Sequence, residues 1–223
     1  MRYFLKSLGV YSFHPAPIAS SSVFWENEYV LGHNSGPGSY GQLAEYKAEF
    51  IKRLTEKNQV VSVIDAGCGD GNQLSLMNFR EYVGIDVSKT TITRLREKYR
   101  GDSNKQFYLS VDFIPRKVDL VMSLDVIYHL IEDPVFENYM KNLFDWSKRF
   151  VVIYSSNYDD KKWGGHVRHR EFSKWIKSNI MDFKMIYHEQ NPYFAQKGEL
   201  DNTTTAEFYV YERVDTSLER ENA

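Results

Sequence analysis

Cysteine is almost absent from this chain: Cys68 is the only one in 223 residues. No internal disulfide can form, which fits a reducing compartment, and we expect a cytoplasmic protein. Long apolar runs are absent too, so no segment is expected to span a bilayer. The stretch from Met1 to Leu8 carries Arg2 and Lys6 but lacks the apolar centre of a signal peptide.

An excess of either charge is also missing. The chain has 28 Lys and Arg against 30 Asp and Glu, a formal net charge of −2. This balance provides no general attraction to nucleic acid or to an anionic membrane. His166 and His169 have ligand-like spacing, but no cysteine or acid cluster accompanies them. We therefore expect no metal.

The residues that are abundant are those of a globular protein. Hydrophobic residues make up 42% of the chain and aromatic residues 15%, enough for one domain with a sizeable core. We expect a single domain in three parts: an N-terminal segment and helix (1–58), a core (59–155), and a loop, helix and C-terminal hairpin (156–214).

Strand and helix patterns alternate through the middle of the chain, which predicts βαβ units and a parallel sheet. Residues 1–38 are expected to be irregular. The predicted strands are 60–65, 82–86, 106–111, 118–123 and 150–154, followed by two more at 183–188 and 206–211. The predicted helices are 40–57, capped by Ser39, 88–99, capped by Ser88, 134–147, capped by Asp133 with Pro134 first, and 170–179.

A glycine-rich turn follows the first predicted strand. Gly67 and Gly69 lie just after Asp65, where glycine permits a left-handed backbone and a close approach to a ligand. Asp86 ends the next strand about twenty residues later, where a carboxylate can accept the hydroxyls of a ribose. A dinucleotide is the competing ligand, but Asn72 stands where its fingerprint needs a third glycine. Asp65 would repel a pyrophosphate, so the ligand more plausibly carries an ammonium or a sulfonium.

Residues 65–71 resemble the first motif of class I S-adenosylmethionine (SAM) dependent methyltransferases, and residues 109–113 and 119–130 resemble later motifs in register. The resemblance implies a Rossmann-like, seven-stranded, mostly parallel sheet with a C-terminal antiparallel hairpin and helices on both faces. It implies SAM as cofactor, S-adenosylhomocysteine (SAH) as product, and an N-terminal lid. The implied cofactor-binding residues are Tyr40, Asp65, Gly67, Cys68, Gly69, Asp86, Val87, Asp112, Phe113 and Leu124.

His129 is the candidate catalytic residue. It follows the fourth strand together with Tyr128, a candidate substrate contact, and an ordinary histidine can act as a base near neutral pH. A histidine packed in a helical turn is the alternative. After the fifth strand come further candidate substrate contacts, which would suit an anionic acceptor: Trp163, His166, Arg168, His169 and Arg170. A solvated basic helix start is the alternative there.

Three short stretches, 36–41, 125–130 and 166–170, resemble a bacterial subgroup of small methyltransferases of glycan and small-molecule gene clusters. We therefore expect methyl transfer to a small-molecule or glycan acceptor, at a hydroxyl. An RNA or protein methyltransferase is the second hypothesis, although the chain lacks an Asn-Pro-Pro-Tyr motif after strand four and a basic surface. A non-catalytic SAM-binding module is the third. The oligomeric state is not predicted.

Overall fold

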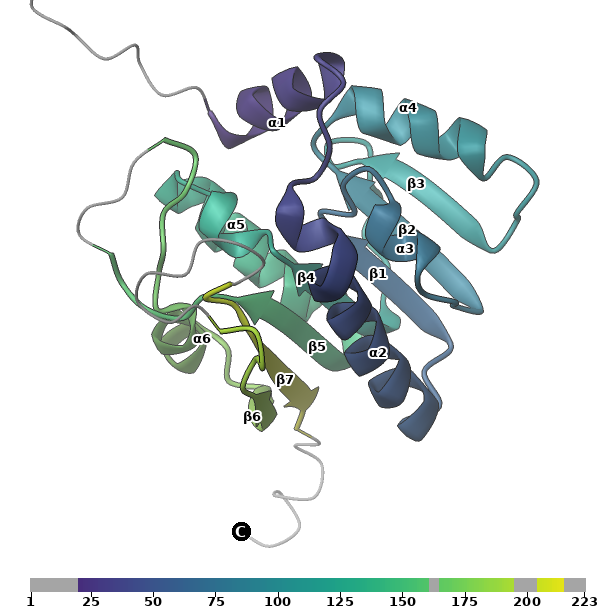
Figure 1. The fold of residues 1–223 in the computed structure, drawn as a ribbon. Coiled ribbons are helices and arrows are strands. Elements are labelled where there is room, and N and C mark those ends of the chain that lie inside the picture. Colours follow the sequence, from purple (N-terminus) through teal and green to yellow (C-terminus); the bar gives the residue numbers. More distant parts are fainter. Residues whose placement is uncertain (1–19, 161–164, 195–203, 215–223) are drawn as a thin grey trace, which may run out of the picture.

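The computed structural model describes residues 20–160, 165–194 and 204–214. Its centre is one seven-stranded sheet in the order β3-β2-β1-β4-β5-β7-β6 (Figure 1). The strands are β1 (Ser62–Ala66), β2 (Glu81–Asp86), β3 (Lys105–Leu109), β4 (Val118–Leu124), β5 (Ser147–Ser155), β6 (Phe183–Glu189) and β7 (Glu207–Arg213).

The sheet has a parallel half and an antiparallel end, as expected. Strands β1 to β5 pair in parallel, and β7 pairs antiparallel with both β5 and β6. Successive side chains of a strand point to opposite sides of the sheet, and the central strands are buried because an apolar core lies on each side. Val63 belongs to one apolar core and its neighbour Ile64 to the other. The predicted mostly parallel architecture with a C-terminal hairpin is confirmed.

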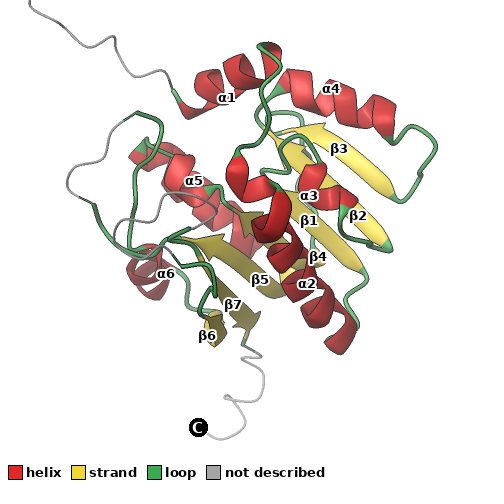
Figure 2. Cartoon of the chain, viewed as in Figure 1, coloured by secondary structure: helices red, strands yellow, loops and turns green. Residues whose placement is uncertain are grey.

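Helices cover both faces of the sheet (Figure 2). One core receives side chains from α2 (Gly41–Lys57), α3 (Asn72–Ser75) and α4 (Lys89–Lys98). The other receives side chains from α5 (Asp133–Asp145) and α6 (Phe172–Asn179). This three-layer arrangement leaves the carboxyl ends of β1, β2 and β4 as the edge where a ligand site is expected.

The first helix, α1 (Ser21–Val30), lies across that edge, beside the start of α4 (Figure 1). The expectation that residues 1–38 are irregular is wrong for this part. Ser20 caps α1 by accepting a hydrogen bond from the Val23 amide. A 3₁₀ turn, η1 (Pro37–Ser39), precedes α2, and a second, η2 (Ile127–His129), follows β4.

Two of the three predicted helix caps are wrong. Ser88 does cap α4, since its hydroxyl accepts from the Thr91 amide at 3.1 Å. Ser39 lies inside η1, and α2 begins after Tyr40 without a side-chain cap. Asp133 is the first residue of α5 and not its cap. Its carboxylate pairs with Arg168 and Arg170, partners far along the chain that local capping patterns do not include.

Candidate functional site

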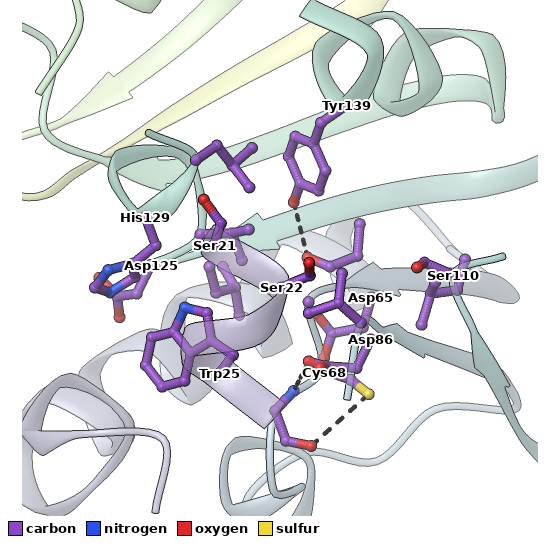
Figure 3. A pocket seen from close by; sticks show the side chains of 18 of the residues that line it. Ser21, Ser22, Trp25, Asp65, Cys68, Asp86, Ser110, Asp125, His129 and Tyr139 are labelled. Atoms are coloured by element: carbon purple, nitrogen blue, oxygen red, sulfur yellow. Dashed lines mark hydrogen bonds between the residues drawn. The ribbon is translucent and has the colours of Figure 1, made fainter. Parts of the chain in front are cut away.

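A cavity of about 450 Å³ opens at the carboxyl ends of β1, β2 and β4, with α1 above it. Figure 3 shows Asp125 and His129 at one end and Asp65, Cys68 and Asp86 towards the other, with Trp25 of α1 in front. Seven of the ten predicted cofactor-binding residues line it: Asp65, Gly67, Cys68, Gly69, Asp86, Val87 and Leu124. His129 lines it too. The motif residues that are separate in sequence therefore share one space.

The glycine turn owes its shape to backbone conformations that other residues adopt only under strain. Gly67 has φ +83° and Gly69 φ +55°. A Cβ at Gly67 would lie 2.4 Å from Cγ2 of Val126, and one at Gly69 would lie 2.3 Å from Oγ of Ser35. Both glycines are therefore required sterically as well as conformationally. The turn is a cradle that side chains would fill.

Two buried carboxylates flank this cradle. Asp86, 8% exposed, accepts hydrogen bonds from the amides of Gly69 at 3.0 Å and Ser88 at 2.9 Å. Asp65, 2% exposed, accepts one from the Tyr82 hydroxyl at 2.9 Å. Burial raises the pKa of Asp86, and raises that of Asp65 to about 7. Each carboxylate has lone pairs left over, so a ligand cation or hydroxyl group in the cavity would find acceptors here.

Lys47 of α2 is a cavity residue that the sequence analysis missed. Its side chain is 1% exposed, and its ammonium pairs with the Asp125 carboxylate at 2.5 Å. Asp125 has φ +60°, and its other oxygen accepts a hydrogen bond from the Tyr128 hydroxyl at 2.9 Å. Within an amphipathic helix a lysine usually marks the solvent face, so nothing in the sequence signalled this burial. Tyr128 itself does not line the cavity; it holds Asp125 in place.

Loop residues 34–40 are pinned onto the glycine turn. Ser35 and Asp70 bond reciprocally: the Ser35 amide donates to the Asp70 carboxylate at 2.8 Å, and the Asp70 amide donates to the Ser35 hydroxyl at 2.9 Å. The Tyr40 hydroxyl donates to the same carboxylate, and burial, together with this bond, raises the pKa of Tyr40 to about 12. Tyr40 therefore positions Asp70, whereas Ser35 and Ser39 line the cavity.

Hydrogen bonds to carboxylates fasten α1 at its first residue and near its middle. The amide and hydroxyl of Ser21 donate to Glu132, which precedes α5. Glu26 accepts hydrogen bonds from the hydroxyls of Ser88 and Thr90, at the start of α4. These bonds lower the pKa of Glu26, most of all the one from Ser88. The helix thus bridges the two helical layers above the sheet.

His129 lies in a cluster of rings. Its Nδ1 lies 3.2 Å from the carbonyl oxygen of His166, and a carbonyl can only accept, so Nδ1 carries the proton and Nε2 has the lone pair. The Trp25 ring meets it edge-on at 4.9 Å between centroids. Burial lowers the pKa of His129 to about 4. It is neutral near pH 7 and a weaker base than the sequence analysis assumed.

The basic residues after β5 have roles inside the protein. Arg170, 8% exposed, donates to the carbonyls of Leu130 and Ile131 and pairs with Asp133 at 3.0 Å. Arg168 donates to the Ile131 carbonyl and pairs with Asp133 at 2.9 Å. Neither lines the cavity. The two guanidiniums, predicted to meet an anionic acceptor, instead fasten the segment between η2 and α5.

The two histidines of that segment also stand outside the cavity lining. The His166 ring stacks on Phe24 with centroids 3.9 Å apart. Nδ1 of His169 lies 2.6 Å from the Ser156 hydroxyl. His166 therefore contributes to the site through its carbonyl, which orients His129. Trp163 lies outside the described residues.

After β3 the cavity lining is shifted by two residues from the prediction. Ser110 and Val111 line it, but Asp112 and Phe113 do not. The Asp112 side chain is exposed, and Phe113 packs edge-on against Trp146 with centroids 5.0 Å apart. The predicted adenine contacts thus lie beside the cavity in this structure.

The described part of the chain has neither a membrane-spanning helix nor a metal-binding cluster. None of its helices is long and apolar enough to cross a membrane. Nor do its His, Cys, Asp and Glu residues form a group that could hold a metal ion.

Comparison with known proteins relates this chain to methyltransferases. Residues 63–149 match the family model described as a methyltransferase domain. No curated protein sequence is significantly similar to the chain.

Solved structures of methyltransferases share its fold. The N-methyltransferase NodS from Bradyrhizobium japonicum WM9, in complex with SAH, has 16% identity and a TM-score of 0.67, covering 88% of this chain and 100% of that one. The magnesium protoporphyrin IX methyltransferase from Synechocystis PCC 6803, with bound SAM, has 14% identity and a TM-score of 0.60, covering 89% and 99%. A SAM-dependent methyltransferase from Clostridium acetobutylicum ATCC 824 has 16% identity and a TM-score of 0.61, covering 85% and 99%. Residues 63–149 therefore match a methyltransferase domain, and the sheet of the chain is that of the Rossmann-like methyltransferase fold.

Proposed function

We propose that this protein transfers a methyl group from SAM to a small-molecule acceptor within the cavity under α1. The observation that carries the proposal is the pair of buried carboxylates, Asp65 and Asp86, on either side of a glycine cradle open to the cavity. A ribose and an ammonium are the groups that two such carboxylates would bind, and SAM carries both.

A further acceptor atom supports this fit. Gln73 is 6% exposed and lines the cavity; its amide nitrogen donates to the Ala44 carbonyl, but its Oε1 has no partner. A buried, unpaired oxygen costs free energy that a donor from a ligand would recover. Asp65 and Gln73 would thus hold the ammonium of SAM, Lys47 its carboxylate and Asp86 its ribose. SAM supplies the activated methyl group.

The protein's contribution to the reaction is alignment in an enclosed space. The cradle and the carboxylates would hold the donor, and α1 would close the site against water, so that the acceptor meets the methyl group in line with the departing sulfur. Among the described lining residues Lys47 is the only Lys or Arg. This favours a small acceptor over RNA, which needs a basic path for its phosphates.

Calorimetric titration with SAH tests the donor site. Asp86→Ala should weaken binding roughly 10- to 100-fold, since hydrogen bonds to a charged group contribute about 1.5–3 kcal/mol. Asp112→Ala removes a carboxylate that lies outside the cavity and is the matched control, with little expected change. Wild-type protein that does not bind SAH, or equal affinities for Asp86→Ala and wild type, would contradict the proposal.

Turnover separates the remaining alternatives. Release of SAH from SAM in the presence of small acceptors excludes a non-catalytic SAM-binding module. Repeating the assay at low and high salt tests the RNA alternative, since an RNA acceptor gives a steep salt dependence.

A further inference from the structure

An acceptor would meet the donor at the end of the cavity away from Asp86. Three groups form this end: the Asp125 carboxylate, the imidazole of His129, whose Nε2 has a lone pair, and the indole of Trp25. The charge of Asp125 acts on His129, and Figure 3 shows the two at the same end. All three groups attract a donor of hydrogen bonds or a cation.

We propose that the group methylated by this enzyme is an amine, bound between Asp125, His129 and Trp25, so that the reaction is an N-methylation. This inference rests on the proposed function, which supplies the methyl donor. It replaces the hydroxyl and the anionic acceptor that the sequence analysis favoured.

The charges facing the cavity support an amine. The described lining residues include five carboxylates, those of Asp65, Asp70, Asp86, Asp125 and Glu132, against the single ammonium of Lys47. SAM brings a net charge of only +1, so the occupied site retains a negative potential. Such a site attracts a cationic acceptor and repels an anionic one. The arginines that could have reversed this balance are bonded elsewhere, to Asp133.

The backbone at Asp125 supports a binding role for its carboxylate. A non-glycine residue at φ +60° is strained and persists only where its surroundings impose this conformation. Lys47 and Tyr128 impose it here, each by a contact to one carboxylate oxygen. Both oxygens keep a lone pair, so an amine N–H can be accepted without breaking either contact.

The state of His129 fits an amine better than an alcohol. An alcohol must lose its proton as the methyl arrives, which calls for a base stronger than a histidine whose pKa is near 4. A neutral amine already has a lone pair to donate. Nε2 of His129 and the Asp125 carboxylate can each accept an N–H, and this turns the nitrogen lone pair towards the donor.

An amine that arrives as its ammonium has no free lone pair, so it first gives one proton to water. The methyl transfer then balances without a further reactant. The nitrogen lone pair forms the new bond to the methyl carbon while the carbon–sulfur bond breaks, and its electron pair stays on sulfur. The positive charge of the sulfonium thus passes to nitrogen, and the methylated ammonium later loses a proton to water.

Matched acceptor pairs test the proposal on the wild-type enzyme: benzylamine with benzyl alcohol, glucosamine with glucose, and cyclohexylamine with cyclohexanol. We expect at least one pair in which the amine is methylated, or binds the SAH-loaded protein by saturation-transfer NMR, roughly tenfold or more better than its alcohol. The proposal would be overturned if, in all three pairs, the alcohol were preferred or methylated as well as the amine. It would also be overturned if none of the amines bound at millimolar concentration.

A variant tests whether Asp125 is responsible. Asp125→Asn should reduce the preference for the amine roughly tenfold, with residual SAH binding as the check that it is folded. Glu137→Gln removes an exposed carboxylate of α5 outside the cavity and should leave the preference intact. An unchanged preference in folded Asp125→Asn would remove Asp125 from the acceptor site. Protein that binds SAH but shows no amine preference contradicts only this inference, whereas protein that does not bind SAH contradicts the proposed function itself.

Discussion

The two ends of the cavity are built in different ways. At the Asp86 end the chain folds on itself over a short distance: β1, the glycine turn and β2 are close in sequence, and the amides of Gly67 and Cys68 both donate to the Ile85 carbonyl. At the His129 end the parts come from α1, from η2 and from residues 166–170. The Asp86 end depends on backbone shape and is called the backbone end. The His129 end depends on long-range contacts between side chains and is called the side-chain end. Changes at the first should therefore act on donor binding, and changes at the second on stability and acceptor choice.

The strongest test of the backbone end is Gly67→Val. A valine at this position would clash with the side chain of Val126, and its backbone would have to adopt a φ of +83°. The turn must therefore distort. We expect SAH affinity to fall by more than about 100-fold, equivalent to about 3 kcal/mol. Gly101→Val is the matched control, since a Cβ at Gly101 has nothing within 4 Å. Normal SAH binding by Gly67→Val would show that the turn is not the donor cradle.

The side-chain end is tested by Arg170→Ala. The buried guanidinium bonds two carbonyls and a carboxylate, so its loss should lower the free energy of unfolding by about 2 kcal/mol. Chemical denaturation measures this, and Lys174→Ala, which removes an exposed cation in the first turn of α6, is the control. If Arg170→Ala kept full stability but raised the acceptor KM, the guanidinium would belong to the acceptor site after all.

The smallest expected effect concerns pH at the backbone end. The pKa of Asp65 is raised to about 7, so in free protein this carboxylate takes up a proton as the pH falls below 7. An ammonium ligand needs the charged form, and SAH affinity should therefore weaken towards pH 5.5, by at most about tenfold per pH unit. Calorimetry across this range measures the slope. Asp65→Asn should flatten it, and a slope that persists unchanged would assign the proton to Asp86, whose pKa burial also raises.

The predictability of each part from sequence follows the same division. The sheet, the glycine turn and Asp86 rest on local patterns: alternating burial, left-handed glycines and a strand-end acid. The α1 helix was missed because apolar Val23, Phe24 and Trp25 are consecutive and form no helical stripe. Its place is set by the contacts of Ser21 and Glu26 with residues more than sixty positions away.

The misplaced charges have a similar cause. Arg168 and Arg170 were expected at the site because arginines suit an anionic acceptor, and no local pattern identified Asp133 as their partner. Lys47 was overlooked because the partner that permits its burial, Asp125, is 78 residues away. A charged residue in a sequence indicates that a partner is needed, and only the fold shows which one it has.

The position of α1 has a consequence for the rate of the catalytic cycle. The helix lies over the cavity and is held at its first residue, Ser21, and near its middle, through Glu26. If exchange of spent SAH for SAM requires one of these attachments to open, product release is coupled to displacement of a whole helix. Weakening either attachment would shorten the residence time of SAH, and turnover would rise wherever release is the slow step.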